Sequence, residues 1–276
     1  MSQKFIHMSL EEALTPERHA DFLCLLKIPA IANALDMGGW IAGGLPRHLL
    51  LDLPLTEYFG EDSNRRAGDV DIFFASVDEA NRAAAFEESL QSSYGGFALE
   101  AQARFAHRTL RVQFVNHPDK VYQSVEGTLE NFDFLNCMVG LTRNKLIVAE
   151  GWHEAEAAKL LKICNATSPF LGSRINKYLT ERGLENISPD SQENLTAWLC
   201  RASNQDYSGI TQQHASGLQY AVKTLADLGH VRREDFLFFI GKYQMFVKER
   251  AYGETKVFDW ALHHIGESTS NNLMNV

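Results

Sequence analysis

The sequence is poor in cysteine, and no motif built from cysteine or histidine suggests a metal or redox centre. Four cysteines occur in 276 residues, far apart and without a Cys-x-x-Cys pair. Zinc ribbons and redox dithiols usually carry such a pair, so neither is predicted. The ten histidines show no spacing of metal ligands, and we expect no zinc. We expect reduced core thiols at Cys24, Cys137, Cys164 and Cys200.

Long hydrophobic runs are also missing. No stretch approaches the roughly 20 apolar residues that a membrane-spanning helix needs. The N-terminal segment Met-Ser-Gln-Lys-Phe-Ile-His lacks the apolar core of a secretion signal. We therefore expect a cytoplasmic protein with no membrane partner.

Positive charge is scarce, with 26 Lys and Arg against 35 Asp and Glu and a formal net charge of −9. This balance argues against a protein that coats nucleic acid over its whole surface. The excess of acid lies in residues 1–150, whereas residues 151–276 are nearly neutral. A polyanion would therefore be expected on the C-terminal half, because local clusters of charge set the field near a groove.

The remaining composition is typical of a globular protein, with 45% hydrophobic and 22% charged residues. Strand and helix patterns are mixed up to about residue 150. After Gly151 we see helical patterns and no strand, near 153–164, 173–182, 190–202, 209–228, 232–250 and 255–265. The sequence predicts an α+β protein, with a mixed sheet and flanking helices in residues 1–150 and an all-helical domain in residues 151–276.

Several local patterns define the expected elements. Ser9 begins a short capping-box helix, and Thr15-Pro16 begins another. Residues 54–68 are polar and aperiodic, which predicts a mobile loop. The other expected elements are helices over 30–37 and 78–90, a hairpin of 97–106 with 109–115, and a hairpin of 138–141 with 145–149.

A short apolar run, Trp40-Ile41-Ala42, is followed by Gly43-Gly44 and a helix that accepts Pro46 in its first turn. A glycine turn that enters a helix can bring backbone N–H groups and the positive helix end close to phosphates. Arg47, near the start of this helix, could add a charge-assisted hydrogen bond. The alternative is that the two glycines only make a turn.

A second pattern is Asp69-Val70-Asp71-Ile72-Phe73-Phe74, which is typical of a strand with one open end. The carboxylates of Asp69 and Asp71 leave the same face and lie roughly 6–7 Å apart at the backbone. Two carboxylates so placed can hold a divalent cation that neutralises triphosphate oxygens. The alternative is a merely solvated pair.

Together these two patterns resemble the DNA polymerase beta-like nucleotidyltransferase superfamily, through Ile41–Gly44 with Arg47 and through Gly68–Phe73. The resemblance implies a small mixed sheet with flanking helices, Mg²⁺, and transfer of a nucleotidyl group from a nucleoside triphosphate to a hydroxyl. Residues 131–138, Asn-Phe-Asp-Phe-Leu-Asn-Cys-Met, are similar to the Arg-Asp-Phe-Thr-Ile-Asn-Ala segment of tRNA CCA-adding enzymes, without the basic residue before the Asp. The spacer 45–68 is longer than is usual in the superfamily.

The superfamily usually takes a third carboxylate from a later strand, and the aligned position here is Gln113. An amide is neither an anionic ligand nor a base. Either the protein binds nucleotide without catalysis, or another acid substitutes. Asp133 is our candidate for that acid, although it could instead cap a turn or pair with an arginine such as Arg111.

In the C-terminal half, Arg174, Lys177 and Tyr178 share one helix face, with Arg182 a turn later. Such a face could contact an RNA backbone while Tyr178 stacks on a base. The alternative is a solvated face.

The sequence therefore predicts a Mg²⁺-dependent nucleotidyltransferase with a nucleoside triphosphate substrate. The expected metal ligands are Asp69 and Asp71, and the expected phosphate contacts come from Gly43, Gly44 and Arg47. An RNA 3′ end is the first choice of acceptor, and a protein hydroxyl, as in toxin-type members, is the second. A non-catalytic relative that binds nucleotide or RNA, and an unrelated α/β protein with a coincidental motif, are the competing hypotheses.

Overall fold

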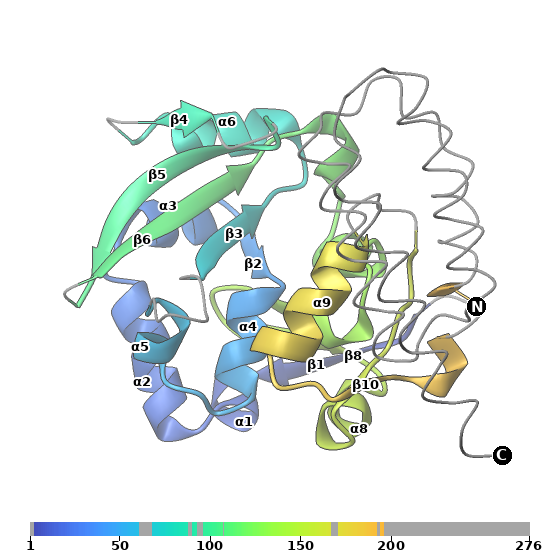
Figure 1. The fold of residues 1–276 in the computed structure, drawn as a ribbon. Coiled ribbons are helices and arrows are strands. Elements are labelled where there is room, and N and C mark those ends of the chain that lie inside the picture. The colour runs from blue at the N-terminus through green and yellow to red at the C-terminus, as the bar shows by residue number, and fades with distance from the viewer. Residues whose placement is uncertain are drawn as a thin grey trace, which may run out of the picture.

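Eight strands form one mixed sheet in the computed structural model, which describes residues 3–60, 68–87, 90–92, 96–106, 108–166, 171–191 and 194–195 (Figure 1). The strand order is β1-β8-β7-β2-β3-β6-β5-β4. β3 and β6 pair in parallel, and the other neighbours pair antiparallel. The strands are β1 (Phe5–Ser9), β2 (Trp40–Ala42), β3 (Asp69–Phe73), β4 (Gln91–Ser92), β5 (Ala98–Phe105), β6 (Arg108–Val115), β7 (Val139–Leu141) and β8 (Lys145–Ala149).

Two helices near the N-terminus begin at the capping residues that the sequence predicts. Ser9 caps α1 in a complete capping box, and Thr15 caps α2 with Pro16 in its first turn. α6 is shorter than the predicted helix over 78–90. The helices of this part are α1 (Leu10–Ala13), α2 (Pro16–Leu25), α3 (Pro29–Asp36), α4 (Gly44–Leu50), α5 (Leu55–Tyr58) and α6 (Val77–Ala84).

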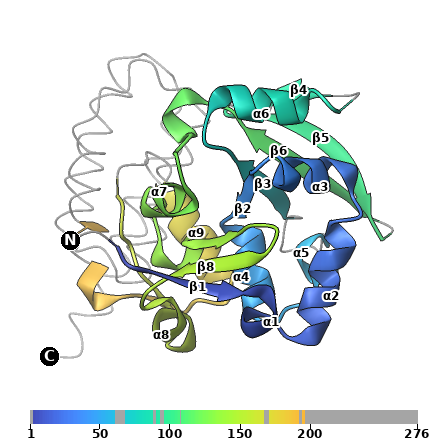
Figure 2. The ribbon, with the colours of Figure 1, turned by 180° about the vertical axis from the view of Figure 1, so that it is seen from behind.

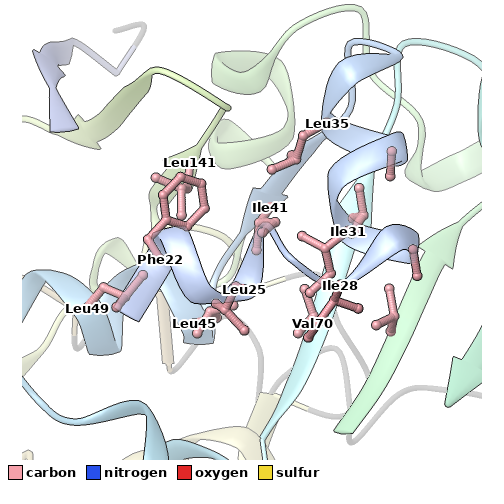
Figure 3. Close-up of a cluster of buried hydrophobic side chains, with 14 of the residues drawn as sticks. Phe22, Leu25, Ile28, Ile31, Leu35, Ile41, Leu45, Leu49, Val70 and Leu141 are labelled. Carbon is pink, nitrogen blue, oxygen red and sulfur yellow. The ribbon is translucent and has the colours of Figure 1, made fainter. Parts of the chain in front are cut away.

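One face of the sheet packs on α2, α3 and α6. Figure 3 shows Ile41 and Val70 directed at side chains of α2 and α3. Val70 and Ile72 are fully buried in this core. Side chains alternate along a strand, so Asp69 and Asp71 must lie on the opposite face. The apolar packing of β3 therefore fixes the face on which its two carboxylates lie.

The opposite face has its own small core. Trp40 of β2 donates its indole N–H to the Thr128 hydroxyl of α7 (Val125–Glu130) at 3.1 Å. Phe73 and Val115 are buried in the same cluster, at the ends of β3 and β6. Two 3-10 turns flank α7 in the chain, η1 (Pro118–Lys120) and η2 (Leu135–Cys137). Beyond them, α9 (Leu171–Glu181) lies beside α4, on the side of the sheet away from α3 (Figures 1 and 2).

The two predicted hairpins are confirmed as β5 with β6 and β7 with β8. Two expectations about residues 1–60 need correction. β1 was not predicted, because its short segment lacks a clear apolar alternation; it pairs with β8 at the sheet edge (Figure 2). α5 lies inside the segment expected to be a loop, where Leu55 and Tyr58 are buried. Residues 61–67 of that segment lie outside the described residues.

Residues 151–191 are not purely helical, contrary to the sequence prediction. α8 (Trp152–Ala157) ends before the predicted boundary, because Lys159 takes a left-handed conformation (φ 53°) and a strand follows. A two-stranded parallel sheet joins β9 (Leu160–Leu161) to β10 (Asn186–Ile187), with α9 (Leu171–Glu181) between them and η3 (Pro189–Ser191) after them. The helices predicted beyond residue 195 lie outside the described residues, and the proposed division at residue 150 stays a prediction.

Among the described helices, none combines the length and the apolar composition needed to cross a bilayer. The three described cysteines are free. Cys137 is buried and Cys164 partly buried, whereas Cys24 is exposed, contrary to the core position expected for it. Cys200 lies outside the described residues.

Candidate functional site

A cleft of about 880 Å³ lies on the polar face of the sheet. Its walls come from the glycine turn after β2, the polar side chains of β3 and β6, the segment around Asp133, and α9. Segments far apart in the sequence thus meet here. This one cleft is lined by every residue predicted for the site from sequence: Gly43, Gly44, Arg47, Asp69, Asp71 and Asp133. It is also lined by Arg174, Lys177 and Tyr178, which were predicted as an RNA-binding face.

The two carboxylates of β3 occupy the floor of the cleft. Arg111 of β6 lies 3.3 Å from the Asp69 carboxylate. Burial and the nearby charge of Asp69 raise the pKa of Asp71 to about 8. The folded chain therefore resists a second negative charge at this place. A bound cation would relieve that repulsion.

The glycine turn depends on its first residue. Gly43 has φ +91° and ψ −120°, a conformation that side-chain-bearing residues rarely adopt, and it caps α4. Gly44 is required for a different reason, since a Cβ there would lie 2.7 Å from the Tyr58 hydroxyl. That hydroxyl donates to the carbonyl of Asp69 at 3.0 Å. Tyr58 therefore connects the turn to the strand that carries the carboxylates.

Arg47 serves a different partner from the one expected. Its Nε and Nη2 donate to the two carboxylate oxygens of Glu156 in α8, both at 2.7 Å, and Nη2 also donates to the Arg182 carbonyl at 3.2 Å. Both side chains are buried, so the guanidinium needs this counter-charge. These contacts make Arg47 a support that joins α4, α8 and the end of α9, and the phosphate contact expected of it stays a prediction.

Three cations of α9 and the residue after it line the cleft opposite the carboxylates: Arg174, Lys177 and Arg182. Desolvation and the nearby charge of Arg182 lower the pKa of Lys177. The sequence spacing predicted that these residues share one face of a helix. It did not predict that this face would line the same cleft as the carboxylates of β3. The RNA contact expected of them stays a prediction, and their position in the cleft was missed.

Tyr178 does not present its ring to solvent. It is 9% exposed, its hydroxyl accepts from the Cys137 thiol at 2.8 Å, and its ring lies against Phe134. The Arg47 guanidinium lies 5.5 Å from the centre of the same ring. The base stacking expected of Tyr178 is therefore contradicted by its packing in the core between α9 and residues 134–137.

Asp133 does not join the carboxylates of β3. It is 4% exposed and forms an ion pair with Arg174. Burial raises the pKa of Asp133, which Arg174 partly offsets. Within the described ranges, no three His, Cys, Asp or Glu side chains gather closely enough to hold a metal. Asp133 therefore makes the ion pair that was its alternative role, with Arg174 instead of Arg111 as the partner, and its role as third acid stays a prediction.

Gln113 lies on the strand next to Asp71, at the position where the resemblance to the superfamily placed a third carboxylate. It lies directly beside Asp71 in the parallel pairing of β3 and β6. Its Nε2 donates to Glu100 of β5 at 3.1 Å. Glu100 was not identified from sequence, although the register of the predicted hairpin places it next to Gln113.

The residues of the floor fit a divalent cation such as Mg²⁺. Mg²⁺ is usually held by one or two carboxylates, with waters and substrate phosphates completing its shell. Asp69 and Asp71 supply two carboxylates on one strand face, and the raised pKa of Asp71 shows that negative charge there lacks full compensation.

No protein-family model matches this sequence, and no curated protein matches it. Among solved structures, the chain is similar to a Thermotoga maritima CCA-adding enzyme complexed with tRNA, with TM-score 0.49 and 14% identity over 82% of this chain and 55% of that one. It is similar to an apo CCA-adding enzyme at TM-score 0.49 and 15% identity, over 87% and 54% of the two chains. It is also similar to a CCA-adding enzyme in complex with ATP, with TM-score 0.48 and 12% identity over 81% of this chain and 54% of that one. This chain thus spans about half the length of those chains, and similarities of this size do not establish its family.

Proposed function

We propose that this chain binds a nucleoside triphosphate with Mg²⁺ in the cleft and transfers its nucleotidyl group to a hydroxyl. One observation carries the proposal: two carboxylates, a glycine turn and three cations from distant segments line a single cleft. Opposite charges on facing walls suit a metal-bound polyphosphate, in which cation and anion lie side by side.

Each wall has its own role. Asp69 and Asp71 hold the metal, which when bound neutralises phosphate oxygens and lowers the pKa of an attacking hydroxyl. Gly43 and Gly44 let backbone approach the phosphates. Lys177 lies across from the carboxylates and can compensate the charge of the departing pyrophosphate. In the transfer, the hydroxyl oxygen bonds to the α-phosphorus, the bond to pyrophosphate breaks, pyrophosphate leaves with the electron pair, and the hydroxyl proton passes to solvent water.

Positioning residues surround this site. The Arg47–Glu156 pair fixes α4 against α8, and the Arg174–Asp133 pair fixes α9 against the segment after α7. These ion pairs are made within the protein, so the walls can keep their arrangement before substrate binds. Pre-arranged charges stabilise a transition state better than charges that must first reorganise.

The acceptor that we propose is an RNA 3′ end. The likeness of residues 131–138 to the tRNA enzymes and the basic residues of α9 support this choice over a protein hydroxyl. A second function, nucleotide binding without transfer, is favoured by one specific observation: an amide, Gln113, lies beside Asp71 where a third acid is usual in the superfamily.

The test is incubation of the protein with each labelled nucleoside triphosphate, Mg²⁺ and total RNA, followed by separation of labelled products. Transfer should occur with the wild type and with Asp36→Asn, which changes an exposed carboxylate outside the cleft. It should be lost in Asp71→Asn. Nucleotide binding without any labelled RNA or protein would select the second function, and label transfer by Asp71→Asn would refute the first.

A further inference from the structure

Three polar side chains form a row across adjacent strands of the cleft floor: Asp71 of β3, Gln113 of β6 and Glu100 of β5. Their Cα positions are in register, and neighbouring strands lie roughly 4.8 Å apart. On the other face the corresponding row is apolar and buried, Val70 with Val112 and Ala101. The three polar side chains therefore project together on the cleft side.

The hydrogen bond to Glu100 fixes which way the amide of Gln113 is turned. Nε2 of Gln113 donates to the Glu100 carboxylate at 3.1 Å. An ionised carboxylate can only accept, so the amide must direct its NH₂ group, and not its oxygen, toward β5. β6 lies between β3 and β5 in the sheet. The NH₂ group of Gln113 is thus engaged by Glu100, which leaves the amide oxygen as the group that Gln113 can offer to a ligand in the cleft that it lines.

Two oxygen acceptors consequently lie on neighbouring strands, one from Asp71 and one from Gln113. A cation that both can bind satisfies such a pair, and amide oxygens are accepted ligands of hard divalent cations. Two carboxylates and one neutral amide also balance the charge of a divalent ion.

We propose that Gln113 supplies a neutral carbonyl oxygen as the third protein ligand of the cation held by Asp69 and Asp71, and that Glu100 sets the orientation of its amide. The inference rests on the metal site of the proposed function. Glu100 is a positioning residue, because it acts through Gln113 and does not line the cleft itself.

The experiment measures Mn²⁺ binding to the full chain, with free Mn²⁺ counted by electron paramagnetic resonance. Glu100→Lys places a donor where the acceptor was, so the amide should reverse and present its NH₂ to Asp71. Loss of an orienting partner outside the ligand shell typically costs about 10- to 100-fold in metal affinity. We expect at least a tenfold loss for Glu100→Lys and a similar loss for Gln113→Leu.

Two matched variants separate orientation from charge. Gln102→Lys adds one positive charge on the same strand, two residues away at an exposed position, which is half the charge change of Glu100→Lys, and should weaken binding less than about threefold. Glu100→Gln can still accept from Gln113 and should retain affinity within about threefold. In the Gln113→Leu background, Glu100→Lys should cost no more than Glu100→Gln and Gln102→Lys together, which make the same total change of charge, since there is no amide left to reverse.

Folding of each variant is checked by near-ultraviolet circular dichroism, and Gln113→Asn, whose shorter amide cannot reach as far, replaces Gln113→Leu if the latter does not fold. The inference is overturned if Glu100→Lys loses no more affinity than Gln102→Lys, or loses the same amount with and without Gln113. A wild type that binds no Mn²⁺, or an Asp71→Asn variant that binds as tightly as wild type, would instead remove the metal site of the proposed function and this inference with it.

Discussion

The two faces of β3 are built by different rules. Val70 and Ile72 on one face are fully buried among aliphatic side chains of α2 and α3, where shape and volume decide stability. Asp69 and Asp71 on the other face meet charges from β6 and α9. Val70 and Ile72 therefore anchor β3 in the hydrophobic core. The intervening residues Asp69 and Asp71, held in place by the same backbone, are available for polar contacts.

The comparison teaches that the cleft can carry unfavourable local electrostatics because the opposite face supplies the stability. Like charges two residues apart cost free energy in the absence of a cation. Buried apolar side chains on the other face contribute roughly 1.5–3 kcal/mol each. Substitutions on one face should therefore change folding, and substitutions on the other should change ligand binding.

Val70→Asp should show the largest effect, because it brings a charge into the apolar face. We expect the free energy of unfolding to fall by more than about 4 kcal/mol, which unfolds many domains. Urea denaturation followed by circular dichroism measures it. A Val70→Asp protein that unfolds at the same urea concentration as wild type would show that this face does not carry the stability.

Glu156→Ala should show the next largest effect on stability. It is an exception to the rule that polar residues of the cleft side affect ligand binding alone, because Glu156 is polar and yet supports the fold. It leaves the Arg47 guanidinium buried without its counter-charge, which costs about 3–5 kcal/mol. Urea denaturation again measures the loss. The double variant Arg47→Met with Glu156→Leu should recover most of it. A loss below about 1 kcal/mol for Glu156→Ala would mean that the pair does not support the cleft.

Asp71 should give an effect that depends on pH and has a defined sign. Its folded-state pKa of about 8 lies above the ordinary value of about 3.9, so the folded chain binds more protons than the unfolded chain between these values. Without metal, the free energy of unfolding should fall as pH rises from about 4 to about 8, by less than about 1.4 kcal/mol per pH unit. Thermal melts of wild type and Asp71→Asn measure the difference. A difference between the two that does not change with pH would contradict the raised pKa.

Gly43→Ala should have the smallest effect of the four on stability. A Cβ at Gly43 meets only the Phe132 ring, at 3.5 Å, so the cost is backbone strain of about 1–3 kcal/mol. Gly44→Ala is the informative comparison, because its Cβ would strike the Tyr58 hydroxyl and disturb the link to β3. We expect Gly44→Ala to weaken nucleotide binding through that link. Equal melting temperatures for wild type and Gly43→Ala would refute the strain.

Much of the scaffold could be predicted from sequence, because it depends on local chemistry. The capping box at Ser9, the Thr15-Pro16 helix start and the alternation of β6 each specify their element with neighbours in the chain. The glycine turn and the carboxylate pair were found for the same reason.

The partners within the cleft could not be predicted, because they come from segments far apart in the chain. Arg47 meets Glu156, 109 residues later, and Asp133 meets Arg174, 41 residues later. The sequence gives no register between such segments. Glu100 is the exception: Phe105 pairs with Arg108 across the hairpin, and counting back from that pair reaches Glu100 and Gln113.

Equilibrium binding of a non-hydrolysable nucleoside triphosphate analogue tests the cleft as a nucleotide site most directly. It should be measured by isothermal titration calorimetry with and without Mg²⁺, for wild type, Asp71→Asn and the surface control Asp36→Asn. We expect Mg²⁺ to strengthen binding at least tenfold in wild type and Asp36→Asn, and to have no effect in a folded Asp71→Asn protein. Binding that is equally tight with and without Mg²⁺ in all three proteins would contradict a metal-bound triphosphate at Asp69 and Asp71.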